Sequence, residues 1–197
     1  MTTDQNADSA LKNTVRQAAL ARRDALAPDW RAEISAKLGG ADGPAMPLAA
    51  DTVVAGFHPI RSELDIRPLM ARLAGQGARI CLPAIVDAHT ILFRRWTPGA
   101  PLVEMALGTV GPGDDAEALD PDLILMPLSA FDRHGGRIGY GGGFYDRAIA
   151  ALRARGLSPR LIGVAFDCQQ AERVPTEPHD VALDEILTES GLRRLPY

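Results

Sequence analysis

"LILMPLSAFDRHGGRIGYGGGFYDRAIAALRARG", residues 123–156, places a dense group of glycines between two different kinds of sequence. Residues 123–128 form an apolar run of strand length, and residues 144–156 carry apolar residues at helical spacing. Between them lie the four glycines Gly139, Gly141, Gly142 and Gly143. Because ordering a glycine costs more backbone entropy than ordering other residues, a simple turn would use one or two. We interpret this loop as a place where backbone approaches a ligand.

A strand–loop–helix unit of this kind also indicates which ligand the loop would take. In an open α/β sheet such loops lie at the carboxyl ends of the strands, where ligands bind. The first turn of the following helix offers unpaired N–H groups and partial positive charge, which suit a phosphate. Two common nucleotide motifs do not match, because Phe144 replaces the third glycine of G-x-G-x-x-G and no lysine follows as in a Walker loop. The glycines alone therefore predict an anion site, with a tightly packed turn as the alternative.

Strands and helices alternate along the rest of the chain. We expect strands at residues 52–57, 78–85, 90–96, 123–128, 160–166 and 185–189. We expect helices at residues 9–26, 28–38, 65–77 and 144–156, with Ser9 capping the first and Pro28 opening the second. This alternation predicts right-handed crossovers and a largely parallel sheet. The expected fold class is therefore α/β, a three-layer sandwich with a mostly parallel central sheet.

We expect residues 1–197 to form a single domain that begins with an N-terminal helical arm. The arm spans residues 9–38, and the Gly- and Pro-rich residues 39–50 predict a flexible linker after it. Hydrophobic residues make up 46% of the chain, which is enough for a large core.

The composition also limits which binding partners and which cellular compartment we expect for this protein. The net charge of −4 argues against nucleic acid, and no apolar run approaches the ~18 residues that a membrane span needs. The two cysteines, Cys81 and Cys168, are far apart, and the polar N-terminus lacks the apolar region of a secretory signal. We expect a cytoplasmic monomer with no nucleic-acid and no membrane partner.

"RIGYGGGFYDR", residues 137–147, closely resembles the glycine-rich motif of 5-formyltetrahydrofolate cyclo-ligases, also named 5,10-methenyltetrahydrofolate synthetases. Further segments resemble the same family, namely residues 11–26, 57–69, 123–137 and 163–189. The resemblance implies conversion of 5-formyltetrahydrofolate to 5,10-methenyltetrahydrofolate, with ATP as co-substrate, Mg²⁺ as cofactor, and release of ADP and phosphate.

The implied reaction has a clear chemical logic. ATP phosphorylates the formyl oxygen, N10 attacks the activated carbon, and phosphate leaves. A formamide carbon is a poor electrophile and its oxygen a poor leaving group, and phosphorylation corrects both. The protein is then left with positioning and charge neutralisation as its main tasks.

On the ATP side, the resemblance implies catalytic roles for Lys12, Arg16, Tyr145 and Asp146. Lys12 and Arg16 lie at i and i+4 on one helix face and would bind the ATP phosphates, the alternative being a solvated basic face. Asp146 and Asp180 would bind Mg²⁺, the alternatives being a helix-dipole partner and a turn residue. The implied nucleotide-binding segment is Arg137, Ile138, Gly139, Tyr140, Gly141, Gly142, Gly143, Phe144 and Tyr145.

On the folate side, the resemblance implies contacts from Glu63, His58 and Tyr145. The Glu63 carboxylate would accept hydrogen bonds from the pterin, unless it only caps the following helix. His58 follows the first expected strand and suits either a substrate contact or a packed side chain. Trp96 suits a ligand contact or a buried structural role equally well.

This chain also departs from the family pattern inside the glycine loop. Some members carry basic residues there, whereas this chain has Tyr140 and Gly142. We therefore expect Arg137 and Arg147 to share the neutralisation of ATP with the two cations of the arm.

Three other functions fit parts of the sequence less well. A sugar-phosphate isomerase shares a related architecture but would need no ATP. A regulator that senses a phosphorylated metabolite would carry a basic helix-turn-helix, which the arm and the net charge do not supply. A folate-storage protein without activity would bind the same substrate and stays an alternative, although the presence of Lys12, Arg16, Asp146 and Asp180 argues for activity.

Overall fold

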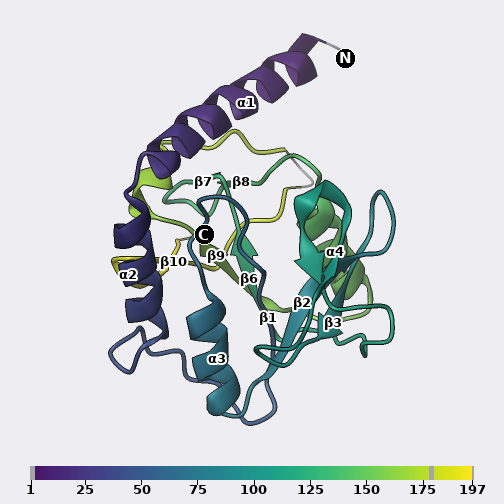
Figure 1. The fold of residues 1–197 in the computed structure, drawn as a ribbon. Helices are drawn as coiled ribbons and strands as arrows, with labels where there is room; N and C mark the ends of the chain where they lie inside the picture. Colours follow the sequence, from purple (N-terminus) through teal and green to yellow (C-terminus); the bar gives the residue numbers. More distant parts are fainter. Residues whose placement is uncertain (1–2, 178–179, 197) are drawn as a thin grey trace.

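The computed structural model describes residues 3–177 and 180–196, and it describes side chains from residue 8 onward (Figure 1). A seven-stranded sheet forms its centre, in the order β11-β10-β9-β6-β1-β2-β3. Neighbouring strands are parallel from β2 through β10, whereas β3 and β11 join the two edges antiparallel. The strands are β1 Val53–Ala55, β2 Arg79–Ile85, β3 Ile91–Arg95, β6 Leu123–Pro127, β9 Arg160–Val164, β10 Glu185–Thr188 and β11 Gly191–Arg194.

Helices cover both faces of the sheet and complete three layers (Figure 1). Helices α2 (Pro28–Gly39) and α3 (Arg67–Gly75) pack on one face of the sheet. Their buried side chains Leu38, Leu69 and Leu73 belong to the hydrophobic cluster on that face, which we call the first core cluster. Helix α4 (Phe144–Ala154) packs on the other face of the sheet. Its buried side chains Ile149 and Leu152 belong to a separate hydrophobic cluster there, which we call the second core cluster. The structure therefore confirms the predicted α/β sandwich with a mostly parallel sheet.

Helix α1 (Thr3–Asp24) runs along the rim, and its N-terminal part extends beyond the body of the protein (Figure 1). It begins at Thr3, so the expectation that Ser9 caps it is wrong. No glycine or proline lies between Thr3 and Ser9 to end the helical run. Towards its C-terminus Ala19 and Arg23 are buried, and the Arg22 Nε donates to the Cys168 carbonyl at 2.6 Å. None of the described helices is long and apolar enough to cross a membrane.

The two helices on the first face approach each other closely at Gly39, the last residue of α2. A Cβ built there would lie 2.3 Å from the Pro68 Cβ and 2.9 Å from the Leu69 backbone N. After Gly39, residues 40–50 form no helix or strand, yet Met46 is buried in the core. Arg72 also donates to the Pro44 carbonyl at 3.0 Å, so the predicted linker packs against α3.

Short strands that the sequence did not predict shape the loops around the sheet. They form two hairpins, β4 (Val103–Glu104) with β5 (Val110–Gly111), and β7 (Ala130–Phe131) with β8 (Arg137–Ile138). The second hairpin is held by the buried Asp132 carboxylate, which accepts from the backbone N–H groups of His134, Gly136 and Val174. Because β8 ends at Ile138, this hairpin fixes where the glycine loop starts.

Candidate active site

The glycine loop, residues 139–143, joins β8 directly to the N-terminus of α4. Gly141 and Gly143 have φ values of +96° and +64°, a left-handed region that other residues rarely adopt. A Cβ at Gly142 would lie 2.8 Å from the Phe144 ring. Backbone conformation therefore favours glycine at two of the four positions, and the Phe144 ring leaves little room for a side chain at a third. The loop delivers the first turn of α4, with its orphan N–H groups, to the site.

Two cations of α1 reach this loop and its surroundings. The Arg16 Nε donates to the Gly139 carbonyl at 2.9 Å. The Lys12 Nζ lies 2.6 Å from the Asp180 Oδ2 and 3.5 Å from the Glu177 Oε1, and its side chain is only 16% exposed. These contacts argue against a merely solvated basic face and bring the arm, the loop and Asp180 together.

The two predicted magnesium ligands come from neighbouring positions in space. The Asp146 Oδ1 accepts from an Arg137 guanidinium nitrogen at 2.7 Å and from the Val181 backbone N–H at 3.1 Å. Val181 directly follows Asp180, whose Oδ2 accepts from the Glu177 backbone N–H at 2.8 Å. The described residues contain no cluster of three or more His, Cys, Asp or Glu side chains that could hold a metal alone. Two carboxylates without such a cage fit Mg²⁺, which usually completes its shell with phosphate oxygens and water.

The Arg147 guanidinium holds the glycine loop through backbone carbonyl groups. Its Nη2 donates to the Gly142 carbonyl at 2.8 Å, and its Nε donates to the His89 carbonyl at 2.6 Å. Its guanidinium also lies 5.2 Å from the Phe144 ring centroid. Phe144 itself packs against the second core cluster, so its contribution at this position is packing.

Glu63 lies in the segment between β1 and α3, and 8% of the residue is exposed. Its Oε2 accepts from the Ile60 backbone N–H at 2.8 Å. Burial raises the pKa of this carboxyl, and hydrogen bonds from Ile60 and from the Tyr140 side chain oppose that rise. Helix α3 begins at Arg67 with no side-chain cap, so Glu63 is not its capping acid.

Tyr145 places a buried phenol close to the same carboxylate. Its hydroxyl is buried without a hydrogen-bond partner among the described residues, and its ring centroid lies 6.4 Å from that of Phe93. Burial raises the pKa of this phenol, and the charge of Glu63 raises it further. A buried donor without a partner is costly, so this hydroxyl is a candidate for a substrate contact.

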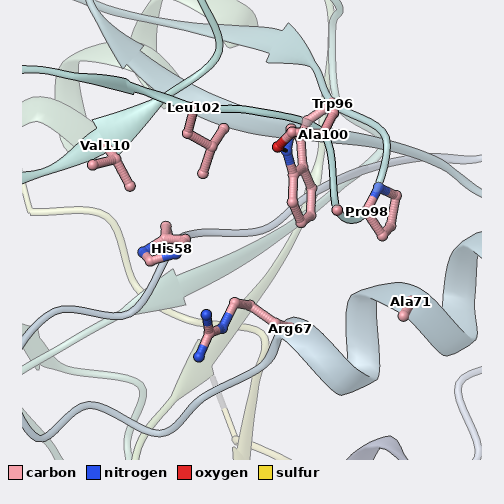
Figure 2. Close-up of a pocket in the computed structure, with 9 residues that line it drawn as sticks. His58, Arg67, Ala71, Trp96, Pro98, Ala100, Leu102 and Val110 are labelled. Carbon is pink, nitrogen blue, oxygen red and sulfur yellow. Dashed lines mark hydrogen bonds between the residues drawn. The ribbon is translucent and has the colours of Figure 1, made fainter.

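A cavity of about 670 Å³ lies beside His58, between α3 and the loop after β3 (Figure 2). Burial lowers the pKa of the His58 imidazole, and the nearby Arg67 guanidinium lowers it further. Trp96 is buried, donates its indole N–H to the Ala100 carbonyl at 3.1 Å and lines the wall, so it is both a structural and a cavity residue. The cavity is lined by His58, Arg67, Ala71, Trp96, Pro98, Gly99, Ala100, Leu102 and Val110.

Arg23 is a site neighbour that the sequence reasoning missed. Its side chain is 1% exposed, and it donates to the Ser62 Oγ at 2.9 Å and to the Tyr140 hydroxyl at 3.1 Å. The positions 12, 16, 19 and 23 follow the i, i+4, i+7, i+11 pattern of one helix face. The helical spacing of position 23 from Lys12 and Arg16 could therefore have predicted that Arg23 lies on the same face as these two residues.

The fold and the site together define a class of protein. A mostly parallel sheet presents a glycine-rich loop at a helix N-terminus, and two cations and two carboxylates meet beside it. This arrangement suits an α/β enzyme that handles a phosphorylated co-substrate.

Comparison with known proteins identifies the family. A model of the 5-formyltetrahydrofolate cyclo-ligase family matches residues 8–189. The 5-formyltetrahydrofolate cyclo-ligase of Escherichia coli (strain K12) is 34% identical over 175 residues, which cover 86% of this chain and 95% of the relative. That of Haemophilus influenzae is 34% identical over 68% of this chain and 74% of the relative. The solved structure of Aquifex aeolicus 5,10-methenyltetrahydrofolate synthetase has a TM-score of 0.76 at 29% identity, covering 94% of this chain and 93% of that chain.

The chain belongs to the 5-formyltetrahydrofolate cyclo-ligase family. This confirms the resemblance, the fold class and the enzyme class that the motifs predicted. The roles of individual side chains, including the magnesium ligands, stay predictions.

Proposed function

We propose that this enzyme converts 5-formyltetrahydrofolate to 5,10-methenyltetrahydrofolate, consuming ATP and releasing ADP and phosphate. The observation that carries the proposal is the meeting of Lys12 and Arg16 with Asp180 and the glycine loop, within a chain of this family. The reducing compartment indicated by Cys81 and Cys168 supports a cytoplasmic setting, and we propose that the enzyme acts as a monomer.

On the nucleotide side, the loop backbone and the first turn of α4 would hold the phosphates. Lys12 and Arg16 would move from their protein acceptors to phosphate oxygens, since both are charge-assisted donors at the loop. Asp146 and Asp180 would hold Mg²⁺, which supplies neutralisation of the phosphate charge. The present pairs, Lys12 with Asp180 and Arg137 with Asp146, keep these partly buried charges compensated until the nucleotide arrives.

On the folate side, Glu63 and Tyr145 would bind the pterin. An ionised carboxylate has acceptor capacity for paired N–H donors, and the Tyr145 hydroxyl needs a partner. The cavity beside His58 has the volume and the mostly apolar walls of a small-molecule site, so it would take another part of the flat substrate. With its pKa lowered, His58 is neutral at pH 7 and would act as a hydrogen-bond partner, not as a cation.

The chemistry then proceeds in two displacements. The formyl oxygen attacks the γ-phosphorus of ATP, the bond to ADP breaks, and an iminium phosphate forms. N10 attacks the activated carbon, the C–O bond breaks, and the departing phosphate takes the N10 proton. Lys12 and Arg16 would stabilise the charge that builds on the transferred phosphoryl group.

A single assay tests the proposal. The protein is mixed with Mg-ATP and 5-formyltetrahydrofolate, and methenyl-folate absorbance is followed in the near ultraviolet. We expect a rise that requires ATP and scales with protein concentration, with stoichiometric ADP. Reactions without ATP, and with Mg²⁺ removed by a chelator, serve as controls. Absence of an ATP-dependent rise at high protein concentration would refute the proposal.

A further inference from the structure

A buried arginine connects the arm to the two substrate sides. Arg23 in the last turn of α1 is among the most buried side chains of the described chain, although arginine is almost never fully buried without partners. Its Nε donates to the Ser62 Oγ, and its Nη1 donates to the Tyr140 hydroxyl. Ser62 directly precedes Glu63, and Tyr140 lies inside the glycine loop. One guanidinium therefore touches both the segment that carries Glu63 and the loop proposed for ATP.

Tyr140 links Arg23 to Glu63. Its hydroxyl accepts from Arg23 at 3.1 Å and lies beside the Glu63 carboxylate, whose ionised form it favours. Its neighbour Gly139 accepts from Arg16, so the same loop is tied to α1 at two adjacent residues. Any movement of the glycine loop that displaces the Tyr140 ring would therefore change the surroundings of Glu63.

Charged and titratable groups face Glu63 from every element around it. Arg23 comes from α1, Arg61 from its own segment, Tyr140 from the glycine loop and Tyr145 from α4. Burial raises the pKa of the Glu63 carboxyl, and Tyr140, Arg23 and Arg61 act in the opposite direction. The hydrogen-bonded pair of Arg23 and Tyr140 thus favours the ionised carboxylate, which is the form that accepts two N–H donors.

We propose that Arg23 and Tyr140 are positioning residues that hold Glu63 oriented for the folate and couple it to the nucleotide loop. The inference rests on the proposed function. Neither residue is assigned a contact with the reacting atoms, since both act through Glu63. Coupling through Tyr140 is reciprocal, so nucleotide on the loop would tighten folate binding by the same factor as folate tightens nucleotide binding.

The test is Tyr140→Phe, which removes only the hydroxyl of a partly exposed side chain. Loss of a hydrogen bond to a charged group predicts a folate KM raised about 10- to 100-fold. Removing a donor that lowers the pKa of Glu63 raises that pKa. Folate binding that needs the carboxylate is lost as pH falls through this pKa, so the variant should lose it at a higher pH than the wild type.

The coupling is measured separately as the folate Kd with and without a non-hydrolysable ATP analogue. We expect the analogue to tighten folate binding to the wild type and to have a much smaller effect on the Tyr140→Phe variant. Arg23→Gln should give a similar phenotype, and the double variant should be little worse than either single one, because both act in one chain of bonds. Arg61→Ala is the comparison variant: it removes a cation that also lowers the pKa of Glu63 and that lies 5.9 Å from the Tyr140 ring centroid. It should therefore shift the pH profile in the same direction, but it should leave the coupling between nucleotide and folate unchanged.

The outcomes separate the two proposals. An inactive wild type would refute the proposed function. An active wild type whose Tyr140→Phe variant keeps the folate KM, the pH profile and the coupling would overturn this inference, even if its melting temperature falls. A change in ATP KM alone, without a shifted folate pH profile, would overturn it as well.

Discussion

Lys12 is one of only two lysines in the chain, and it is the one that lies between carboxylates. The other, Lys37, is exposed on α2. An ammonium on a long flexible stem can leave one acceptor for another at small cost, since its donors rotate freely. Lys12 is therefore suited to exchange Asp180 for a phosphate when ATP binds.

We predict that Lys12→Ala raises the KM for ATP about 10- to 100-fold, the scale of a lost hydrogen bond between charged groups. The KM for 5-formyltetrahydrofolate should change far less, because Lys12 contacts the Asp180 side of the site. Lys37→Ala provides the matched control and should behave like the wild type in steady-state kinetics. A change confined to the folate KM would contradict our placement of α1.

Asp146 gives the second prediction at this scale. Asp146→Asn retains an oxygen acceptor for Arg137 and Val181 but loses the charge that a magnesium ion needs. We expect the Mg²⁺ concentration for half-maximal activity to rise about 10- to 100-fold, with the fold intact by circular dichroism. Asp120→Asn, which alters an exposed pair with Arg155, is the control. Unchanged Mg²⁺ dependence in the first variant would remove the metal role.

The residues found from sequence and those missed differ in physical kind. Lys12, Arg16, Asp146 and Asp180 belong to recognisable local motifs, and the structure brings them together around one loop. Arg23 escaped because burial of an arginine depends on partners far away in sequence, Ser62 and Tyr140. Local sequence patterns identify residues that can bind or catalyse, whereas tertiary packing decides which polar side chains are buried.

Among the elements, the contact between α2 and α3 depends on a single missing side chain. Gly39 lets the end of one helix meet the backbone at the start of the other, with the Pro68 carbonyl carbon 2.6 Å from where a Cβ would be. Backbone cannot yield to such a clash as a flexible side chain would. The helices would have to separate, and the core beneath them would open.

We predict that Gly39→Ala destabilises the protein by about 1–3 kcal/mol, the usual range for overpacking. Gly75 at the end of α3 is the matched control, because a Cβ there meets nothing within 4 Å. Gly75→Ala should stabilise by about 0.5–1 kcal/mol through helix propensity and a less flexible unfolded chain. Urea unfolding measures both, and equal stabilities for the two variants would contradict the close approach.

The ends of the helices and strands were predicted less accurately than their existence. The predicted strands at 52–57 and 160–166 are real but shorter, as Val53–Ala55 and Arg160–Val164. The hairpins β4–β5 and β7–β8 were missed because strands of two residues carry no alternating pattern to detect. Helix α1 was started too late because a serine resembling a cap lies inside a run with no breaker.

At the scale of the whole molecule, alternation of strands and helices was enough to predict the architecture. Apolar strands such as β6, buried at four of five positions, indicate a sheet covered on both faces, and the two core clusters lie on those faces. The antiparallel direction of β3 was not predicted, since direction depends on connections that composition does not encode. The final strand β11 was not predicted at all.

We predict that the intact protein is stabilised by each substrate separately. A ligand at 100 times its Kd adds about 2.7 kcal/mol, which for a domain of this size raises the melting temperature by about 5–11 °C. The measurement is thermal unfolding with 5-formyltetrahydrofolate, and separately with a non-hydrolysable ATP analogue and Mg²⁺. Adenosine without phosphates is the control and should have little effect. A response to folate only would leave the glycine loop without its assigned ligand.

The two edge strands of the sheet, β3 and β11, affect how readily the protein can pair with other chains at high concentration. Strand β3 is covered by the chain near Leu119, whose N–H donates to the Phe93 carbonyl at 2.7 Å. Strand β11 has only four residues, and its Arg193 and Arg194 are exposed. Arg193 pairs with Asp167 at 3.0 Å, and Arg194 lies 3.9 Å from Glu185. A short edge strand with charged side chains is a poor template for another chain, because few ladder bonds would form and the charges would lose water. We therefore expect this edge to resist intermolecular sheet growth.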